Sequence, residues 1–317
     1  MAMSVRNLAL ACGTALLLAG ALAFQGAGAK NPVRYLMIHT DDAGLCATVN
    51  AATVDALERG TVTSASIMAP CPGFEEFARY AAAHPEMDWG VHLTLNSELS
   101  AEARWGPLTS RDKVPSLVGG DGRFHFSTQM VAELANREEV ELELRTQIER
   151  VKAAGIRLSH LDHHMWVMLS RPDLFQLFIQ LGVEYDLPVR IHKQLPEGFN
   201  TWSANDSGET YRNGLELLNA HHFPQFDFID ANNYDAPATE KRAYFLDLIR
   251  GLKPGVSEFV IHVAYNRPGS PRPPASDGRV ADLRMFTSLE IEEEIRAAGV
   301  KLINWRQFRQ MAAARSR

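Results

Sequence analysis

The chain has 317 residues, of which 46% are hydrophobic and 22% charged, and its formal net charge is -6. This composition is enough to bury a full core and excludes a disordered protein. A net negative chain without a long Lys/Arg run lacks the electrostatic surface of a nucleic-acid-binding protein, so no nucleic-acid partner is expected.

Residues 1–29 are predicted to be a secretory signal peptide. Arg6 precedes an almost wholly apolar stretch from Leu8 to Phe24, and Ala27-Gly28-Ala29 fits the small-x-small pattern for cleavage before Lys30. A retained membrane anchor is the alternative. No later stretch approaches the roughly 20 continuous apolar residues that span a bilayer. We therefore expect a secreted or periplasmic protein without a membrane span, in which residues 30–317 form one domain.

Cysteine usage adds little to the fold. Only Cys46 and Cys71 follow the predicted cleavage site, so at most one disulfide is expected, and whether it forms depends on their distance. Because the chain has no Cys-x-x-Cys, a thiolate zinc site is excluded.

The first half of the chain alternates strand and helix patterns. An apolar run that starts at Tyr35 ends in two adjacent carboxylates, Asp41 and Asp42, which predicts a buried strand with both acids at its C-terminal end. Further strands are expected at 64–69, 89–95 and 156–161, and helices at 45–59, 74–83 and 138–154. Residues 96–126 are expected to form a loop, and a loop of this length is usually a lid or a binding loop.

The second half continues the alternation, with helices expected at 172–182, 213–220, 239–252, 288–298 and 305–314, strands at 189–191, 226–229, 257–264 and 299–303, and irregular segments at 193–211 and 266–279. Seven or eight short strands alternating with helices predict an α/β fold, specifically a distorted or incomplete (β/α) TIM-like barrel. Functional groups of such a barrel gather at the C-terminal ends of its strands. The acid pair, His92, His164 and His262 all fall there.

Asp42, His92 and His164 are predicted to bind one divalent metal ion. Imidazoles and a carboxylate are common ligands of zinc and similar ions, and three such ligands leave positions open for water and substrate. A metal held this way makes hydrolysis feasible near neutral pH. Structural alternatives are an Asp that caps the following helix and a histidine packed in the core. The crowding of three imidazoles and a carboxylate in His160-Leu161-Asp162-His163-His164 favours metal binding.

Three further polar residues are candidates for the same site. Asp162 is expected to contact either a ligand histidine or substrate, and His39 is expected to pack or hydrogen-bond behind the ligands. His262 interrupts a buried strand, so it is either a core histidine or the general acid that protonates a leaving amine. Arg279 and Asp282 are candidates to orient it.

Three tryptophans fall in or next to expected loops at the same end of the barrel: Trp105, Trp166 and Trp202. Ordinary loop packing is the favoured interpretation for any one of them, and their clustering is what favours a groove in which they stack against sugar rings.

Four motifs in this order resemble the successive motifs of the YdjC-like carbohydrate deacetylases: Thr40-Asp41-Asp42-Ala43-Gly44, Gly90-Val91-His92-Leu93-Thr94-Leu95, His160-Leu161-Asp162-His163-His164 and Glu258-Phe259-Val260-Ile261-His262. The resemblance implies a distorted (β/α) barrel and a divalent-metal deacetylase, often dimeric, that acts on N-acetylated sugars. By motif, Asp41 would be the general base, Asp42, His92 and His164 the metal ligands, and His262 the late histidine of the family.

The chain departs from the family pattern beside these residues. The family usually has an aromatic residue where Ala43 stands and Asn-Ala where His39-Thr40 stand. Its third motif tends to run His-x-His-x-His, whereas His164 is followed here by Met-Trp-Val-Met, and Val263 replaces the usual proline after His262. The metal ligands of the family are retained, but the residues beside them are atypical. The resemblance therefore predicts metal binding more firmly than it predicts which sugar is the substrate.

The leading hypothesis is a metal-dependent hydrolase, with one Zn or Mg ion, that removes acetyl groups from N-acetylated amino sugars or short oligosaccharides. Asp41 and His262 would be catalytic, Asp162, Trp166 and Arg279 would contact the substrate, and the resemblance implies a homodimer. One alternative is a metallohydrolase that acts on a phosphoester or another amide. The other is a catalytically silent glycan-binding protein of the cell envelope.

Overall fold

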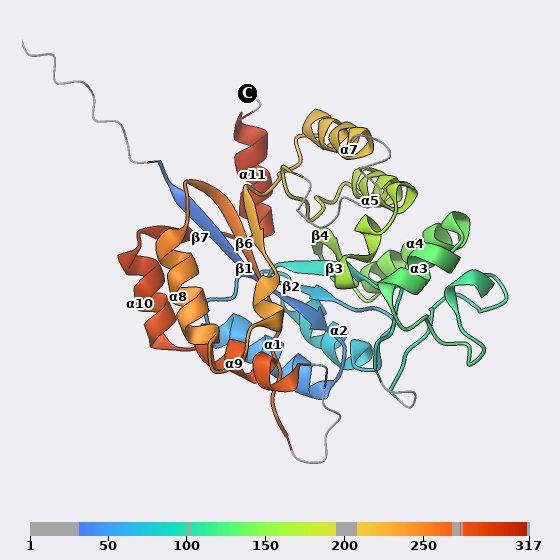
Figure 1. Cartoon of the computed structure of the whole chain (residues 1–317), viewed down its shortest axis with the longest axis horizontal. Coiled ribbons are helices and arrows are strands. Elements are labelled where there is room, and N and C mark those ends of the chain that lie inside the picture. The colour runs from blue at the N-terminus through green and yellow to red at the C-terminus, as the bar shows by residue number, and fades with distance from the viewer. Residues whose placement is uncertain (1–31, 100–102, 195–207, 268–272, 274, 316–317) are drawn as a thin grey trace, which may run out of the picture. The chain divides into compact units, whose positions relative to one another are not determined.

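A parallel β-sheet lies at the centre of the chain and helices surround it (Figure 1). The computed structural model describes residues 32–99, 103–194, 208–267, 273 and 275–315, and residues 33–317 form one compact unit. The strands are β1 (Arg34–Ala43), β2 (Ser64–Ile67), β3 (Trp89–Leu93), β4 (Leu158–His163), β5 (Phe228–Asp230), β6 (Gly255–Ile261) and β7 (Val300–Leu302). They are ordered β4-β3-β2-β1-β6-β5, with β7 also paired to β1.

Strand β1 is the centre of this sheet because it has three partners. Its residues 34–40 pair with β6 on one edge. On the other edge, residues 34–36 pair with β7 and residues 39–43 pair with β2, so two short strands share one long neighbour. The last eight residues of β1 are all buried, as expected for a strand covered on both faces.

The helices are α1 (Ala47–Arg59), α2 (Phe74–Ala83), α3 (Thr128–Leu134), α4 (Arg137–Ala153), α5 (Pro172–Glu184), α7 (Glu209–Ala220), α8 (Lys241–Gly251), α9 (Ser276–Phe286), α10 (Leu289–Ala297) and α11 (Trp305–Arg315), with short 3-10 turns at Pro115–Leu117, His164–Leu169 (η2) and Asn232–Asp235. Helix α5 illustrates why they pack on the sheet. Its residues Leu174, Leu177, Phe178 and Leu181 recur at helical spacing and are fully buried.

The expected α/β fold is confirmed, and the sheet is curled into a half-barrel rather than a complete TIM-like ring. Between β4 and β5 the described chain is linked by two isolated bridges, Leu161 to Val189 and His192 to Phe226. The strand expected at 189–191 is therefore reduced to a single bridge. Pro188 has no N–H to give to a ladder, and Arg190 directs its side chain to buried carboxylates.

Two helices, α3 and α9, were not predicted from the sequence. Helix α3 forms within a stretch for which no element was predicted, and the loop expected at 266–279 gives way to α9 at Ser276. The buried face of α9 includes Arg279 and Asp282 beside Leu283 and Phe286. These two charged residues hide the apolar periodicity that would have predicted the helix.

The segment after β3 is fastened to α4. The side-chain amide of Gln147 pairs with both backbone groups of Thr94, at 2.9 and 2.7 Å. The Glu143 carboxylate accepts the backbone N–H groups of Leu108 and Thr109 at 3.1 and 2.8 Å. Because these anchors are buried side chains of a long helix, the described parts of this segment are held against the domain, which favours the binding loop among the two expected roles, a lid or a binding loop.

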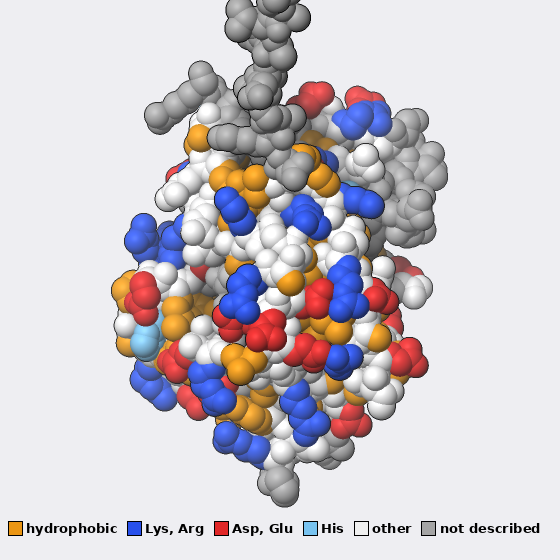
Figure 2. Space-filling view, turned by 90° about the vertical axis from the view of Figure 1, so that its left-hand side faces the viewer, with side chains coloured by type: hydrophobic (Ala, Val, Ile, Leu, Met, Phe, Trp, Pro, Cys, Tyr) orange, Lys and Arg blue, Asp and Glu red, His pale blue; other side chains and the backbone are white. Residues whose placement is uncertain are grey.

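The surface carries mixed charge where α8 and α10 lie. Figure 2 shows basic and acidic side chains interspersed on this face, and the pairs Arg242–Glu290 and Arg250–Glu294 join the two helices. Exposed pairs of this kind contribute little to the free energy of unfolding, which the buried core dominates. Within the described ranges, no helix is long and apolar enough to cross a membrane.

Candidate active site

The two adjacent carboxylates of β1 point to different partners. Asp41 contacts Arg190, and Asp42 contacts His92 and His164. Asp42 has a φ of 70°, in the left-handed region that Asp tolerates better than most residues. Helix α1 begins only at Ala47, so neither acid caps it, and the structural alternative for the pair is excluded.

Asp42, His92 and His164 converge from three elements. The Asp42 Oδ1 atom lies 3.4 Å from His92 Nε2 on β3 and 3.4 Å from His164 Nδ1 at the start of η2. All three side chains are buried, and Asp42 Oδ1 has no hydrogen-bond partner. An unpartnered carboxylate oxygen facing two imidazole nitrogens fits a divalent cation, and these residues are the three that the sequence predicts as ligands.

A carboxylate holds each imidazole from behind. His92 Nδ1 lies 2.8 Å from Asp162 Oδ1, and His164 Nε2 lies 3.0 Å from Glu98 Oε2. Each ring therefore turns its other nitrogen towards Asp42, the arrangement that metal-binding histidines need. Asp162 is fully buried behind His92, which favours this orienting role over contact with a substrate.

Charge in this cluster is strongly coupled. Burial alone would lower the pKa of His92, but Asp41 and Asp162 raise that pKa to about 10. Burial is likewise outweighed at His164, where Glu98 and Asp42 raise the pKa to about 9. Against the effect of burial, Arg279 and the two imidazoles hold the pKa of Asp42 well below its usual range. The buried carboxylates thus favour positive charge beside them. A divalent ion would supply this charge and would be bound by the neutral form of the imidazoles.

A buried arginine that the sequence analysis did not single out binds Asp41. Arg190 donates to both Asp41 oxygens at 2.8 and 3.1 Å, and its guanidinium also lies 2.9 Å from Asp162 and 3.2 Å from Glu258. His39 completes this cluster, with Nε2 at 3.2 Å from Asp41 and 3.1 Å from Asp162. We call these five residues the Arg190 cluster. His39 thus hydrogen-bonds behind the ligands, in the position expected for it.

The Arg190 cluster keeps Asp41 ionised. Burial would raise the pKa of Asp41, but Arg190 and His92 hold it below its ordinary range. At Glu258 burial prevails, and the pKa is raised. A signal for both missed residues was present in the sequence, because Arg190 and Glu258 are charged residues inside short apolar runs. A charge in such a run is buried and needs a partner of opposite sign.

His262 lies at the end of β6, on the Asp41 side of the site. Its Nε2 atom is 3.9 Å from Asp41 Oδ2, and its ring packs against Tyr234 at 4.8 Å between centroids. Asp282 accepts the backbone N–H of His262 at 3.3 Å. Arg279, the other candidate to orient His262, instead donates to Asp42 Oδ2 at 2.6 Å. Burial lowers the pKa of the His262 ring to about 3.

The three tryptophans do not form the expected common platform. Trp105 is 3% exposed and packs against the ring of His164, with 6.2 Å between centroids, which agrees with the ordinary loop packing favoured for a single tryptophan and not with a platform for sugar rings. Trp202 lies outside the described residues. Trp166 is partly exposed and, like Met165, has a left-handed backbone, with φ values of 57° and 48°.

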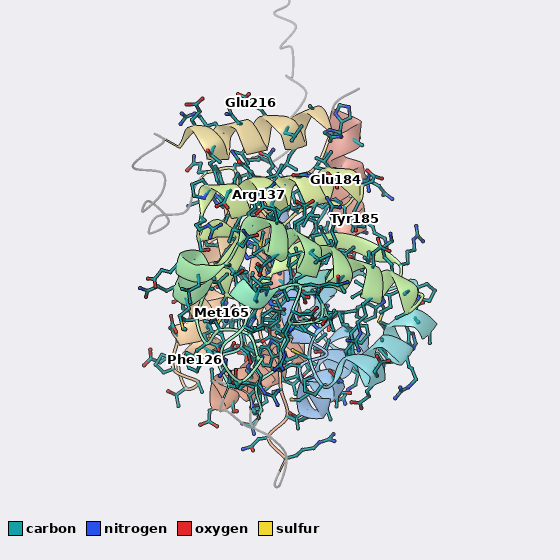
Figure 3. All side chains as sticks on the ribbon, turned by 90° about the vertical axis from the view of Figure 1, so that its right-hand side faces the viewer. Phe126, Arg137, Met165, Glu184, Tyr185 and Glu216 are labelled. Atoms are coloured by element: carbon teal, nitrogen blue, oxygen red, sulfur yellow. The ribbon has the colours of Figure 1, made fainter. Side chains whose placement is uncertain are left out.

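This left-handed pair follows His164 directly, where the sequence departs from the family pattern. The turn brings Met165 to the surface, where it is 45% exposed, and Figure 3 shows Met165 and Phe126 on one face of the molecule. Two consecutive left-handed residues other than glycine are strained, and such strain clusters at functional sites. Cys46 and Cys71 are both free thiols, so no disulfide supports the site.

Comparisons with known proteins agree with this geometry. The model of the family described as YdjC-like protein matches residues 35–297. A carbohydrate deacetylase of Geobacillus stearothermophilus is 30% identical over 277 residues, which cover 87% of this chain and 98% of the relative. A carbohydrate deacetylase of Enterococcus faecalis is also 30% identical, and the match covers 85% of this chain and 96% of the relative. A crystal structure from Enterococcus faecalis V583, proposed to be a cellobiose-phosphate cleavage protein, aligns with a TM-score of 0.71 at 28% identity, covering 87% and 98%.

The predicted export of the protein needs correction. Residues 1–31 lie outside the described residues and precede the family match, so nothing shows a signal peptide or cleavage after Ala29. Homologous deacetylases are generally cytoplasmic, and the prediction of a secreted or periplasmic protein is therefore wrong. It rested on composition alone, since any apolar, small-residue segment after an arginine satisfies the same pattern.

Proposed function

Because the chain belongs to the YdjC-like protein family, we propose that it is a metal-dependent carbohydrate deacetylase, which hydrolyses the amide of an N-acetylated amino sugar or short oligosaccharide. The observation that carries the metal requirement is the buried Asp42 Oδ1 atom, which lacks a hydrogen-bond partner and lies 3.4 Å from imidazole nitrogens of two different elements. Asp42, His92 and His164 would hold the ion, Zn²⁺ or Mg²⁺.

The ion, when bound, supplies a Lewis acid that polarises the acetamide carbonyl and lowers the pKa of water in the site. The residues around it provide the rest of the chemistry. Arg279 neutralises the second oxygen of Asp42, which leaves Oδ1 to face the imidazoles. Asp162 and Glu98 fix the two rings. Trp105 packs edge-on against the ring of His164.

Asp41 is the proposed general base. Its Oδ2 atom lies 3.8 Å from Nε2 of His92, so Asp41 borders one of the residues that would hold the ion. Arg190 donates hydrogen bonds to both oxygens of Asp41 and so fixes the orientation of the carboxylate. In the reaction, Asp41 takes one proton from the attacking water while the hydroxyl adds to the acetyl carbon.

His262 is the proposed general acid. Its Nε2 atom is 3.9 Å from Asp41 Oδ2, so a proton taken up by Asp41 can reach the ring after a small movement. The amide C–N bond then breaks, the ring gives its proton to the departing nitrogen, and acetate and a free amino sugar leave. Trp166 is the proposed contact for the sugar because it is partly exposed next to His164, and Arg279 borders the same space through Asp42.

The two alternative functions are less well supported. A two-metal phosphoesterase would need a second ion among Asp41, His92 and Asp162, but Arg190 lies 2.8 and 2.9 Å from those carboxylates and already supplies a fixed positive charge there. A silent glycan-binding protein would use exposed aromatic side chains, and Trp105 is buried.

The test is acetate release by the full chain from N-acetylglucosamine and its oligomers, with and without a chelator. Release that the chelator abolishes and added Zn²⁺ or Mg²⁺ restores would support the proposal. Bound metal without acetate release from any sugar would contradict it. Phosphate release from sugar phosphates at two ions per chain would favour the phosphoesterase.

A further inference from the structure

Glu98 is a charged partner of the site that no motif of the sequence pointed to, and it lies in the segment between β3 and α3. It follows β3 by five residues in the segment that α4 holds in place. Its Oε2 atom lies 3.0 Å from His164 Nε2, and its side chain is only 16% exposed. Asn96, from the same segment, donates to Oε2 at 3.4 Å, which fixes the carboxylate from a second side.

The two imidazoles of the candidate metal centre use different nitrogens. His92 presents Nε2 to Asp42 and keeps Nδ1 for Asp162, whereas His164 presents Nδ1 to Asp42 and keeps Nε2 for Glu98. Glu98 is therefore the counterpart of Asp162 on the opposite imidazole. A carboxylate in this position accepts the ring N–H, selects the tautomer whose other nitrogen is free, and makes that nitrogen a stronger ligand.

The segment around Glu98 is built to hold this contact. The Ser97 hydroxyl accepts the backbone N–H of Trp105 at 3.1 Å, and the Ser97 N–H donates to the His125 carbonyl at 2.9 Å. Trp105 packs on the His164 ring from the same segment. The carboxylate and the indole thus restrain one ring on two sides, and both depend on the anchoring of this segment to α4.

We propose that Glu98 is a positioning residue of the metal centre, which orients His164 so that its Nδ1 atom binds the ion together with Asp42 and His92. The inference rests on the metal centre of the proposed function, but it does not depend on which sugar is deacetylated. It makes the segment after β3 part of the metal centre.

The test is Co²⁺ binding to the full chain freed of metal, followed by the visible d–d absorption of the ion and by competition with Zn²⁺. Glu98→Leu removes the acceptor, and Glu98→Gln keeps the shape and a neutral oxygen. We expect Glu98→Leu to weaken Co²⁺ affinity by about 10- to 100-fold and Glu98→Gln to weaken it less. The absorption spectrum at saturation should keep its wild-type form, because the ligands are the same.

Glu86→Gln is the matched control. Glu86 also lies 2.9 Å from an imidazole, that of His84, but this pair is exposed and precedes β3 instead of following it. The control should bind Co²⁺ as the wild type does. Circular dichroism of the metal-free variants shows whether each is folded, and Glu98→Gln serves as the informative variant if Glu98→Leu is not.

Three results would overturn the inference or its premise in distinguishable ways. Wild-type affinity in both Glu98 variants would show that the contact does not position His164. A changed spectrum at saturation would make Glu98 a ligand instead of a positioning residue. A wild-type chain that binds no Co²⁺ and no Zn²⁺ would remove the metal centre itself, and with it the proposed function.

Discussion

Two buried polar clusters meet at the C-terminal end of β1 and differ in one respect. In the Arg190 cluster, a fixed guanidinium reaches three carboxylates at 2.8 to 3.2 Å. In the group of Asp42, His92 and His164, the central oxygen Asp42 Oδ1 has no hydrogen-bond partner and its nearest imidazole nitrogens are 3.4 Å away. Adjacent residues of one strand thus belong to environments with opposite requirements.

This difference in contacts distinguishes a carboxylate that the protein holds in one orientation, Asp41, from a carboxylate that can bind an ion, Asp42. A carboxylate whose oxygens are both held by the protein is fixed in place and carries its own counter-charge. Asp162 Oδ2 and Glu258 Oε2 also lack a hydrogen-bond partner, but they lie 2.9 and 3.2 Å from the Arg190 guanidinium. Asp42 Oδ1 instead faces two imidazole nitrogens at 3.4 Å and retains the capacity to bind a cation. On this basis Asp41 is the residue that acts on protons and Asp42 is the residue that binds the ion.

The strongest test of these separate roles substitutes one residue of each cluster. Asp41→Asn should keep the metal and lose about 10²- to 10⁴-fold in kcat, because the base is removed and the ligands are spared. His164→Ala should lose the metal itself. Metal content by elemental analysis and acetate release measure the two effects. Equal metal loss in both variants would contradict the assignment of separate roles.

Arg190→Met tests whether the Arg190 cluster needs its cation to fold. Loss of the guanidinium leaves Asp41, Asp162 and Glu258 buried without their counter-charge, and removing one partner of a buried pair typically costs about 3–5 kcal/mol of the free energy of unfolding. Chemical denaturation measures it. The control Arg309→Met removes an exposed pair with Asp186 and should cost no more than about 1 kcal/mol. Similar losses would remove the distinction between the two arginines.

Metal binding should stabilise the fold through the other cluster. At a free Zn²⁺ concentration about 100 times its Kd, the free energy of unfolding should rise by about 2.7 kcal/mol, since the ion binds the folded state. A chelator should reverse the resulting increase in Tm. Asp41→Asn should retain the increase and Asp42→Asn should lose it. An increase that survives in Asp42→Asn would place the ion elsewhere.

Gly90→Ala should disturb the Arg190 cluster indirectly, through the neighbouring ring of His160, without contact to the candidate metal ligands. A Cβ atom at Gly90 would overlap the ring of His160, which stacks on Trp305 and lies 3.8 Å from Asp162. Overpacking of this kind costs about 1–3 kcal/mol, whereas Gly120→Ala, with no atom within 4 Å of the new Cβ, should be close to neutral. Co²⁺ affinity should be unchanged in both. Weakened Co²⁺ binding in Gly90→Ala alone would show that the clusters are coupled.

The candidate ligands were predictable because they lie where short apolar runs end. Asp42, His92 and His164 each follow or finish a strand, and parallel strands bring such ends together. Most helices were predictable for a similar reason. Helix α2 has the bounds that its periodicity indicates, 74–83, because the His84-Pro85 pair ends it.

What the sequence did not reveal depends on contacts between distant segments. Arg190 and Glu258 are 68 residues apart and meet only through the curl of the sheet. Glu98 and His164 are 66 residues apart and meet because α4 anchors the segment between them. The burial of Trp105 against His164 is also a contact between distant segments. Periodicity describes one element at a time and contains no information on such pairs.

The pairing of β1 also constrains how the protein is made. Residues 34–43 leave the ribosome early, but their partners in β6 and β7 are residues 255–261 and 300–302. At about 5–20 residues per second, synthesis from β1 to β7 takes on the order of 10–50 s. Until these strands are made, the apolar strand with both aspartates lacks β6 along one edge and β7 along part of the other. Contacts between such distant segments also slow folding. A fragment that ends after His164 would contain all three candidate ligands and still lack both β6, which pairs with residues 34–40, and Arg279, which donates to Asp42.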